Sequence, residues 1–465
     1  MFPESFTERL KTQKYLNAAT LLRALEEPSP SSIRINRAKW DKNPSAGEPV
    51  PWCTSGYYLE KRPSYKADPL FHAGCYYPQE ASSMFIEEVF RQVKPASGKI
   101  RILDLCGAPG GKSTHLSALA GSDGWLIAND VIRSRADILY ENITRWGPVN
   151  TLVTWNDPAD FRHLKGFFDM ILVDAPCSGE GMFRDISAVK QWSEAHLVHC
   201  SARQKRILTD VWPALREGGI LIYSTCTFNP DENEHNLKWF SEKAKAGFVK
   251  LDISRFNMIS EILYEGTAGY AFYPDKAKGE GFFISVLRKE EKHIPEKQGF
   301  AKFSLSKPAG NDLKILKEWT TLDVNSVFRS GDGLFFTATD PDEFIFLSRY
   351  LKIVKSGLKV CSIKGNSYIP SPELALSSTI RTDTFPAVEL AYDEAISYLR
   401  RDKITCEGAE RGWNVVRYKG VNLGFINNTG NRINNYFPLD WRIRNAVTQE
   451  ETNDIIAWSD MQNDR

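Results

Sequence analysis

Between residues 76 and 288, short apolar runs alternate with amphipathic segments, and loops rich in Gly, Pro, Asp and Asn separate them. The apolar runs predict buried strands at 101–105, 125–129, 170–173, 220–223 and 281–287. The amphipathic segments predict helices at 113–120, 133–146 and about 204–215. Strands that alternate with helices are typical of a doubly wound α/β sheet, so we expect a Rossmann-like core here.

The flanking regions follow other patterns. Residues 1–75 combine a helical segment at 6–10, a short strand at 32–36 and a Pro- and Gly-containing loop at 43–51, which predicts a small α+β domain. The stretch from 288 to 299 is rich in Lys, Glu, Pro and Gly and predicts a linker. Short β-like runs at 334–338, 358–361 and 421–426 predict a β-rich region after it. We expect domains at 1–75, 76–288, 300–375 and 380–444, then a polar tail at 445–465 that is disordered.

Composition narrows the class of protein. The chain has 465 residues, of which 42% are hydrophobic and 25% charged, as in ordinary globular proteins. No apolar run approaches the roughly 20 residues of a membrane span, and no secretory signal is visible, so we expect a cytoplasmic protein without a membrane partner. The eight cysteines show no CxxC pair, which argues against a zinc ribbon or a disulfide framework, and we expect no metal.

The formal net charge is only +1, so nucleic-acid binding requires a local basic patch. Residues 398–444 carry nine basic and four acidic side chains, and aromatic residues interleave with them: Tyr398, Trp413, Tyr418, Phe425, Tyr436 and Trp441. The pattern fits a solvated face over an ordinary β core. It fits equally an RNA-docking surface whose aromatic rings stack on unpaired bases.

A glycine-rich loop joins the predicted strand at 101–105 to the next helix. A P-loop needs glycine five positions before the glycine of Gly-Lys-Ser, and Cys106 stands there, so the spacing excludes this motif. The glycines still let a ligand approach the backbone at a helix N-terminus. Asp130 ends the next strand, where nucleotide-binding folds hold a ribose, and Asp157 can accept from an adenine amino group. Adenine and ribose without a cradled phosphate favour S-adenosyl-L-methionine over a dinucleotide.

Two cysteines follow directly after buried strands. Cys177 lies in Asp-Ala-Pro-Cys at 174–177 and Cys226 in Ser-Thr-Cys-Thr at 224–227, whereas Cys75, Cys200 and Cys361 fit ordinary core positions. Ligands of such sheets bind outside the carboxyl ends of the strands, so both thiols can face one substrate. A thiolate that attacks C6 of a pyrimidine makes C5 nucleophilic enough to take a methyl group. Methylation of an exocyclic amino group is usually associated with an Asn/Asp-Pro-Pro-aromatic loop, and a cysteine in place of the aromatic points to ring-carbon chemistry.

These motifs together resemble the Sun-type RNA cytosine-C5 methyltransferases, and within them the bacterial RsmF branch, which modifies small-subunit ribosomal RNA. The matching segments are 77–83, 104–112, 174–181, 224–227, 231–234 and 281–283. Looser matches occur at 2–3, at 32–36 and at 424–438, the last resembling the end of a PUA-like RNA-binding domain. The resemblance implies a Rossmann-like S-adenosylmethionine-dependent methyltransferase core with a small α+β N-terminal domain and a β-rich PUA-like C-terminal region.

The resemblance also implies roles for individual residues. Cys226 would attack C6, Cys177 would assist loss of the C5 proton and product release, and Asp174 would hydrogen-bond the N3/N4 edge of cytosine. Lys112 would act on the base or on the cofactor carboxylate. S-adenosyl-L-methionine would be held by Cys106, Gly107, Ala108, Pro109, Gly110, Gly111, Lys112, Asp130, Asp157 and Asp174. The family often has Arg-Lys-Asp-Pro after the Asp-Ala-Pro-Cys loop, and here only Arg184 of the basic pair is present, as a candidate phosphate contact.

The partner implied is RNA, as ribosomal RNA or the small subunit, and we expect a monomer that does not bind DNA. In the DNA enzymes the nucleophile belongs to the Pro-Cys loop, which would make Cys226 superfluous. Two alternatives remain open at this point. The same chemistry can act on transfer RNA or another RNA, or the chain can be a non-catalytic ribosome-assembly factor that keeps the fold for binding.

Overall fold

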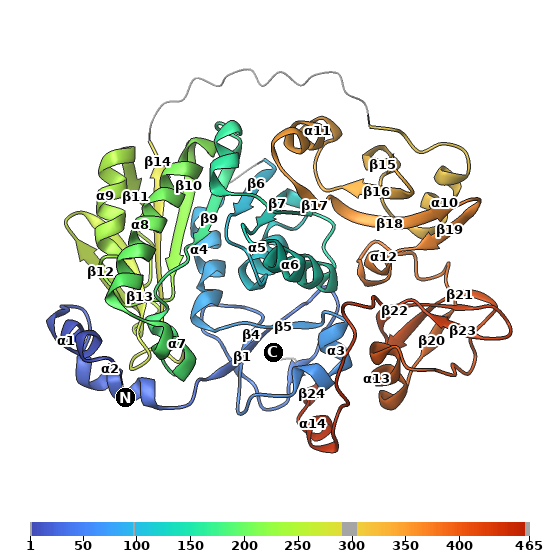
Figure 1. Ribbon diagram of the computed structural model, residues 1–465, viewed down its shortest axis with the longest axis horizontal. Coiled ribbons are helices and arrows are strands. Elements are labelled where there is room, and N and C mark those ends of the chain that lie inside the picture. The colour runs from blue at the N-terminus through green and yellow to red at the C-terminus, as the bar shows by residue number, and fades with distance from the viewer. Residues whose placement is uncertain (1, 96–97, 291–304, 461–465) are drawn as a thin grey trace.

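The centre of the molecule is a ten-stranded sheet, as seen in the computed structural model, which describes residues 2–95, 98–290 and 305–460 (Figure 1). Its strand order is β12-β13-β14-β10-β9-β6-β7-β8-β17, and β11 pairs with β14 off this path. Five neighbouring strands are parallel: β6 (Ile100–Asp104), β7 (Gly124–Asn129), β8 (Thr151–Thr154), β9 (Phe168–Asp174) and β10 (Leu215–Thr225). The chain runs outward from β6 to β8 and then returns to β9 on the other side of β6. This reversal is the topological switch point where such sheets bind ligands.

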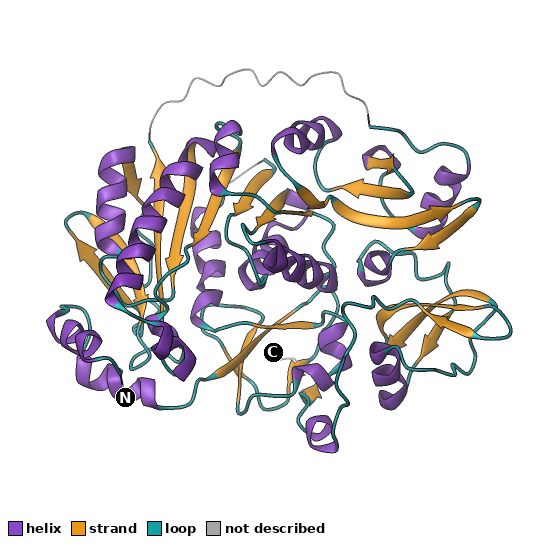
Figure 2. Cartoon of the chain, in the orientation of Figure 1, coloured by secondary structure: helices purple, strands orange, loops and turns teal. Residues whose placement is uncertain are grey.

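Antiparallel strands complete both edges of this sheet. One edge is formed by β11 (Ala246–Phe248), β12 (Ser260–Tyr264), β13 (Thr267–Phe272) and β14 (Phe282–Lys289), and the other by β17 (Ile353–Lys355). Helices cover both faces, as Figure 2 shows: α4 (Ile86–Val93), α5 (Gly111–Ala120) and α6 (Arg133–Trp146) on one, and α8 (Glu194–Val211) and α9 (Glu234–Ala244) on the other. Successive β9 residues alternate between the two faces, with Ile171 in the core under α8 and Leu172 in the core under α5. A sheet buried on both faces explains the continuous apolar runs in the sequence.

The predicted strands of this core and the helices at 113–120 and 133–146 are confirmed. The helix expected at 204–215 is wrong at both ends, because α8 begins at Glu194 and residue 215 already starts β10. Ser193 caps α8 by accepting from the amide of His196, well before the expected start. A short helix, α7 (Ile186–Gln191), precedes α8.

The N-terminal region packs against the core through two helices and a small sheet. The helices are α1 (Glu4–Thr12) and α2 (Ala18–Glu26), and the sheet has the order β3-β4-β1-β5, with a short helix α3 (Pro69–His72) before its last strand. The strands are β1 (Ser31–Ile35), β3 (Glu48–Pro49), β4 (Gly56–Leu59) and β5 (Tyr76–Pro78). Because β5 belongs to this sheet, the expected boundary after residue 75 falls just inside it. The stretch 43–51 is not wholly a loop, since it contains β2 (Asn43–Pro44) as well as β3.

The C-terminal tail is folded as far as it is described. It forms α14 (Gln449–Asn453) and β24 (Trp458–Ser459), and β24 pairs antiparallel with β2 of the N-terminal region. The Trp458 ring lies edge-on to Trp40, with their ring centroids 5.6 Å apart. The expected disorder from 445 onward is therefore wrong up to residue 460. The expected linker at 288–299 lies outside the described residues beyond 290, and β14 extends into its start.

Two further four-stranded sheets follow. The first has the order β15-β16-β18-β19, with β15 (Val327–Ser330), β16 (Gly333–Thr337), β18 (Gly357–Lys364) and β19 (Ser367–Pro370), and with α10 (Asn311–Trp319) and α11 (Pro341–Tyr350) beside it. After α12 (Pro372–Leu376) comes the second, with β20 (Ala387–Glu389), β21 (Gly412–Tyr418), β22 (Val421–Asn428), β23 (Ile433–Asn435) and α13 (Tyr392–Arg400). In Figure 1 both lie on the right, beyond β17 (Ile353–Lys355), which pairs antiparallel with β8 and so joins the central sheet.

The aromatic residues at 398–444 are mainly core residues. Tyr398 is 0% exposed and Phe425 1%, and Tyr418 is also buried. The half-buried Trp413 packs edge-on against Tyr436, with their ring centroids 4.5 Å apart. Tyr398, Tyr418 and Phe425 therefore belong to the β core, and the prediction that they stack on RNA bases is wrong. Among the described residues, no helix is both long and apolar enough to cross a membrane.

Candidate active site

The loops that carry the predicted site residues meet at one edge of the central sheet. Strand β9 ends at Asp174 and β10 at Thr225, and the register pairs Asp174 with Ser224. Strand β6, on the other side of β9, ends at Asp104. Because these three strands are parallel and adjacent, their carboxyl ends project the glycine-rich loop and both cysteine loops into the same space.

A cavity of about 470 Å³ lies at this edge, and half of the predicted site residues line it. Cys106, Ala108, Asp130, Asp174, Cys177 and Cys226 line it together with Arg135, Arg203 and Arg206. A smaller cavity of about 170 Å³ adjoins and is lined by Gly107, Pro109, Gly111 and Lys112, with Cys106, Ala108 and Asp174 shared between the two. Gly110 lines neither. The volume of the first cavity is that of a typical small-molecule site.

The glycine-rich loop folds back tightly on the end of β6. The amide of Gly107 donates to the Asn129 carbonyl at 2.7 Å. A Cβ on Gly107 would come within 2.6 Å of Ser113 Oγ, so no larger residue fits without movement. Gly110 adopts a φ of 122°, which favours glycine. Ser113 donates to Asp104 at 2.6 Å, and burial raises the pKa of the Asp104 carboxyl to about 7.

The two acids proposed for the cofactor differ in their positions. Asp130 is buried and lines the cavity; its Oδ1 accepts from the Ile132 amide at 2.9 Å and its Oδ2 lies 3.3 Å from the Arg135 guanidinium. Asp157 caps the 3-10 turn that follows it and lies 3.4 Å from Arg206, while its neighbour Pro158 lines the cavity. Asp130 lines the cavity, so its carboxylate can reach a ligand bound there. Asp157 does not line the cavity, and its contact with a ligand stays a prediction.

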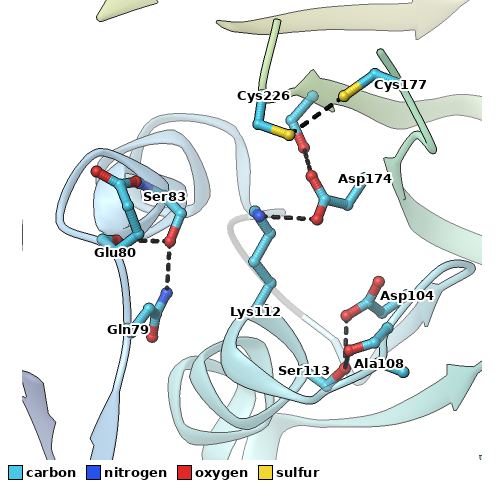
Figure 3. A network of polar contacts seen from close by, with 12 residues as sticks. Gln79, Glu80, Ser83, Asp104, Ala108, Lys112, Ser113, Asp174, Cys177 and Cys226 are labelled. Atoms are coloured by element: carbon cyan, nitrogen blue, oxygen red, sulfur yellow. Dashed lines mark hydrogen bonds and ion pairs between the residues drawn. The ribbon is translucent and has the colours of Figure 1, made fainter. Parts of the chain in front are cut away.

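The two cysteine sulfurs lie next to each other in the lining of the larger cavity. Cys177 Sγ and Cys226 Sγ are 3.2 Å apart, and both thiols are free (Figure 3). The hydrogen bond with Cys226, together with burial and the nearby Glu232, raises the pKa of the Cys177 thiol well above its usual value. The raised pKa favours the protonated form of the Cys177 thiol.

Asp174 is fixed between Lys112 and the second cysteine loop. Lys112 Nζ lies 2.8 Å from its Oδ2, as Figure 3 shows. Ser224 Oγ donates to its Oδ1 at 2.7 Å. Burial alone would lower the pKa of the Lys112 amine, but the Asp174 carboxylate outweighs it and the pKa is raised. Lys112 is therefore an ammonium group in contact with a carboxylate. Lys112 shares the smaller cavity with Asp174, and Asp130 does not line that cavity.

One buried acid that sequence reasoning did not assign connects the two cysteine loops. Glu232 accepts from the Ser178 amide at 2.9 Å, from Ser178 Oγ at 2.5 Å and from Gln204 Nε2 at 3.0 Å. Ser178 Oγ also lies 2.9 Å from Thr227 Oγ1. Ser178 and Thr227 directly follow Cys177 and Cys226 in the chain. The matching segment at 231–234 was the signal that marked this residue, but no local pattern indicated what it contacts.

Gln79 and Glu80 also reach the smaller cavity, from the end of β5. Glu80 accepts from the amides of Ser82 and Ser83, which fixes this turn beside Lys112. Arg184 is half-buried. Its guanidinium donates to the carbonyls of Ala24 at 2.8 Å and Gly279 at 2.6 Å, and its contact with RNA phosphate stays a prediction.

Comparisons with known proteins agree along the chain. Family models match three segments: "N-terminal domain of 16S rRNA methyltransferase RsmF" at residues 2–81, "16S rRNA methyltransferase RsmB/F" at 92–288 and "Methyltransferase RsmF PUA domain" at 385–443. Ribosomal RNA small subunit methyltransferase F of Vibrio parahaemolyticus is 30% identical over 474 residues, which cover 94% of this chain and 97% of that protein.

Two solved structures share the fold. A methyltransferase homolog protein from Pyrococcus horikoshii is 28% identical, with a TM-score of 0.52, and the match covers 62% of this chain and 95% of that chain. NSun6 from the same organism with SFG is 23% identical, with a TM-score of 0.52, and the match covers 63% of this chain and 99% of that chain. At that identity the second likeness shows the fold alone.

Proposed function

The chain belongs to the RsmF family of 16S ribosomal RNA methyltransferases, and from this premise we propose that it methylates C5 of a cytosine in small-subunit ribosomal RNA. The observation that carries the proposal is the 3.2 Å approach of Cys177 Sγ and Cys226 Sγ in the cavity that the glycine-rich loop and Asp130 also line. Two thiols at a cofactor cavity suit ring-carbon methylation, which needs a nucleophile to attack C6 and a base to remove the C5 proton.

The residues at the cavity fit S-adenosyl-L-methionine. The loop around Gly107 leaves no room for a Cβ and brings backbone close to the cavity, and the Asp130 carboxylate offers acceptors for a ribose diol. When bound, S-adenosylmethionine would supply an electrophilic methyl group. Cys106, Ala108 and Asp130 would hold it in the larger cavity, while Asp174 lines both cavities and Lys112 lines the smaller one.

We assign the catalytic roles to three side chains, Cys226, Asp174 and Cys177. The Cys226 sulfur, as thiolate, forms a bond to C6 of the cytosine, and the C5=C6 electron pair becomes available at C5. Asp174, held by Ser224 and Lys112, accepts from the exocyclic amino group of the base. After C5 has been methylated, the Cys177 thiol gives its proton to solvent water, and the resulting thiolate takes the C5 proton. The electron pair of the C5–H bond then re-forms the C5=C6 double bond. The electron pair of the C6–S bond returns to the Cys226 sulfur, which releases the product.

The proposal is tested with 16S ribosomal RNA that contains 5-fluorocytosine, which cannot lose its C5 substituent as a proton, so the covalent adduct persists. Wild type should give an RNA adduct on denaturing gels, and Cys226→Ala should give neither adduct nor methylation. Cys177→Ala should accumulate adduct on ordinary RNA and methylate it poorly. The double variant should behave like Cys226→Ala, because no adduct can form.

The reversed pattern, with adduct in Cys226→Ala and none in Cys177→Ala, would assign the nucleophile to Cys177 instead. Transfer RNA in a parallel reaction separates the substrate classes, since equal methylation of both RNAs would contradict the ribosomal assignment. If both single variants lost activity only through stability, their thermal midpoints would fall while the residual folded protein kept normal turnover.

A further inference from the structure

Three potential metal ligands from separate segments converge on the face of the sheet covered by α4 and α5. Cys53 lies in the loop before β4, Glu87 on α4 and His115 on α5. His115 Nε2 lies 3.0 Å from Glu87 Oε2 and 3.9 Å from Cys53 Sγ. Cys53 is 5% exposed and His115 2%. Among the described residues, these three form the one group of this kind whose donor atoms all lie within 4.8 Å of one another.

We propose that Cys53, Glu87 and His115 form a Zn²⁺ site, separate from the methyl-transfer site. Tetrahedral zinc with ordinary bond lengths places neighbouring ligand atoms roughly 3.3–3.7 Å apart, close to the separations seen here. A thiolate, an imidazole and a carboxylate together suit Zn²⁺ better than the hard cations Mg²⁺ and Ca²⁺, which take oxygen ligands alone. Three protein ligands leave the fourth position for water.

The protonation states of the group allow metal binding with release of a single proton. Burial would raise the pKa of the Glu87 carboxyl, but hydrogen bonds from His115 and the Thr54 amide hold it at about 2, so this ligand is already ionised. Burial lowers the pKa of His115 to about 4, so its ring is neutral. His115 Nδ1 has no hydrogen-bond partner among the described residues, so the ring proton can move to Nδ1 and free Nε2 for the metal. Only the Cys53 thiol must lose a proton.

The surroundings provide access and compensating charge. Glu87 and His115 line a cavity of about 650 Å³, the larger of the two main cavities, which contains neither Cys177 nor Cys226. Thr54 and Ser55 also line it and offer hydroxyls to a metal-bound water. Zn²⁺ with one thiolate and one carboxylate is electrically neutral. Burial and the Glu87 carboxylate raise the pKa of the Cys53 thiol to about 12, and the nearby Arg34 guanidinium offsets this only in part, so the metal ion itself has to displace the thiol proton.

The test measures metal on the full chain. Protein freed of metal by a chelator is titrated with Zn²⁺ and, separately, with Co²⁺, whose thiolate charge-transfer band reports a bound cysteine. Wild type should bind one Zn²⁺ tightly and show the band with Co²⁺. Cys53→Ser should lose the band. Glu87→Gln removes a ligand itself, so it should weaken Zn²⁺ binding at least as much as loss of a residue that only supports a ligand, on the order of a hundredfold. Glu87→Gln keeps the acceptor for the Thr54 amide, so the fold has little reason to change.

Two control variants identify the thiol. Cys361→Ser removes another buried cysteine far from Glu87 and His115 and should bind metal normally. Cys226→Ala breaks the pair of catalytic thiols, the other place where a soft metal could bind, and should also keep the band. The proposal is overturned if wild type binds no stoichiometric Zn²⁺, if the band survives in Cys53→Ser, or if it vanishes in Cys226→Ala. None of these readouts depends on methyl transfer, so failure here leaves the proposed enzyme untouched.

Discussion

At the scale of single residues, Glu232 links the two cysteine loops, although it does not line the cavity itself. It receives both hydrogen bonds of Ser178, next to Cys177, and Ser178 in turn contacts Thr227, next to Cys226. The residue is 0% exposed, so water cannot replace these bonds. Tyr223 also donates to the Glu232 carbonyl at 2.6 Å, which anchors the segment to strand β10.

We therefore expect Glu232→Gln to slow methylation while leaving S-adenosylmethionine affinity unchanged. The new amide nitrogen cannot accept a hydrogen bond, and loss of a bond to a charged acceptor costs about 1.5–3 kcal/mol, on the order of tenfold or more in rate. Single-turnover kinetics should show the defect in adduct formation, through kcat rather than KM. Glu242→Gln, on the exposed side of α9, is the matched control. Equal rates in the two variants would remove Glu232 from the positioning role.

At the scale of elements, a buried ion pair holds β17 at the edge of the central sheet. Lys355 on β17 lies 2.5 Å from Glu373 on α12, with side chains 2% and 7% exposed. Glu373 also accepts from Tyr140 on α6 at 2.8 Å and from the Lys359 amide at 3.1 Å. One carboxylate thus connects the methyltransferase core with the first C-terminal sheet, through the Lys359 amide on β18.

Lys355→Met should destabilise this junction strongly, because it leaves the Glu373 carboxylate buried without a counter-charge. Breaking such a pair costs about 3–5 kcal/mol, and replacing both partners by apolar side chains restores much of it. Thermal melts should show a large loss for Lys355→Met and a partial recovery for Lys355→Met/Glu373→Leu. Lys314→Met, which removes an exposed pair with Glu318, should change the midpoint little. A midpoint for Lys355→Met equal to that of Lys314→Met would contradict the argument.

At the scale of the whole molecule, the C-terminal sheets lie at the opposite end from α9, with the active-site edge of the central sheet between them (Figure 1). With most of the aromatic residues at 398–444 packed inside, the side chains left for RNA are exposed cations such as Lys403, Arg411 and Arg432. We expect this region to dock RNA mainly through phosphate contacts, which give affinity without reading sequence.

Replacing Lys403, Arg411 and Arg432 with Gln should weaken RNA binding and reduce its salt dependence. Removing one phosphate contact should lower the slope of log affinity against log salt by about 0.7 for single-stranded RNA. The control replaces three exposed lysines around the end of α9, Lys243, Lys245 and Lys250, for the same change in net charge. The measurement is the affinity for ribosomal RNA at several salt concentrations. Identical slopes of log affinity against log salt for the two triple variants would exclude the region as the docking surface.

Local patterns in the sequence determined the strands of the core, the helix at 133–146 and the residues that follow each strand end. These features depend on the periodicity of apolar side chains and on loop composition, which are readable within a few residues. The same strand-end patterns selected Cys177, Cys226, Asp130 and Asp157, whereas Asp174 and Lys112 received their roles through the family resemblance. Five of the six positions 106–111 in the glycine-rich loop line the cavities. The start of α8 was missed because residues 194–203 mix polar side chains with a few apolar ones such as Leu197, a pattern too weak to extend the helix back to its Ser193 cap.

Only the tertiary structure decided contacts between residues far apart in the chain. The 3.2 Å separation of the two sulfurs, the contacts of Glu232, the addition of β17 to the central sheet and the convergence of Cys53, Glu87 and His115 each join segments that have no common local pattern. Burial also decided which aromatic residues at 398–444 form core and which cations remain for RNA. Such outcomes depend on how whole elements pack against one another, and a run of side chains looks the same whichever partner finally covers it.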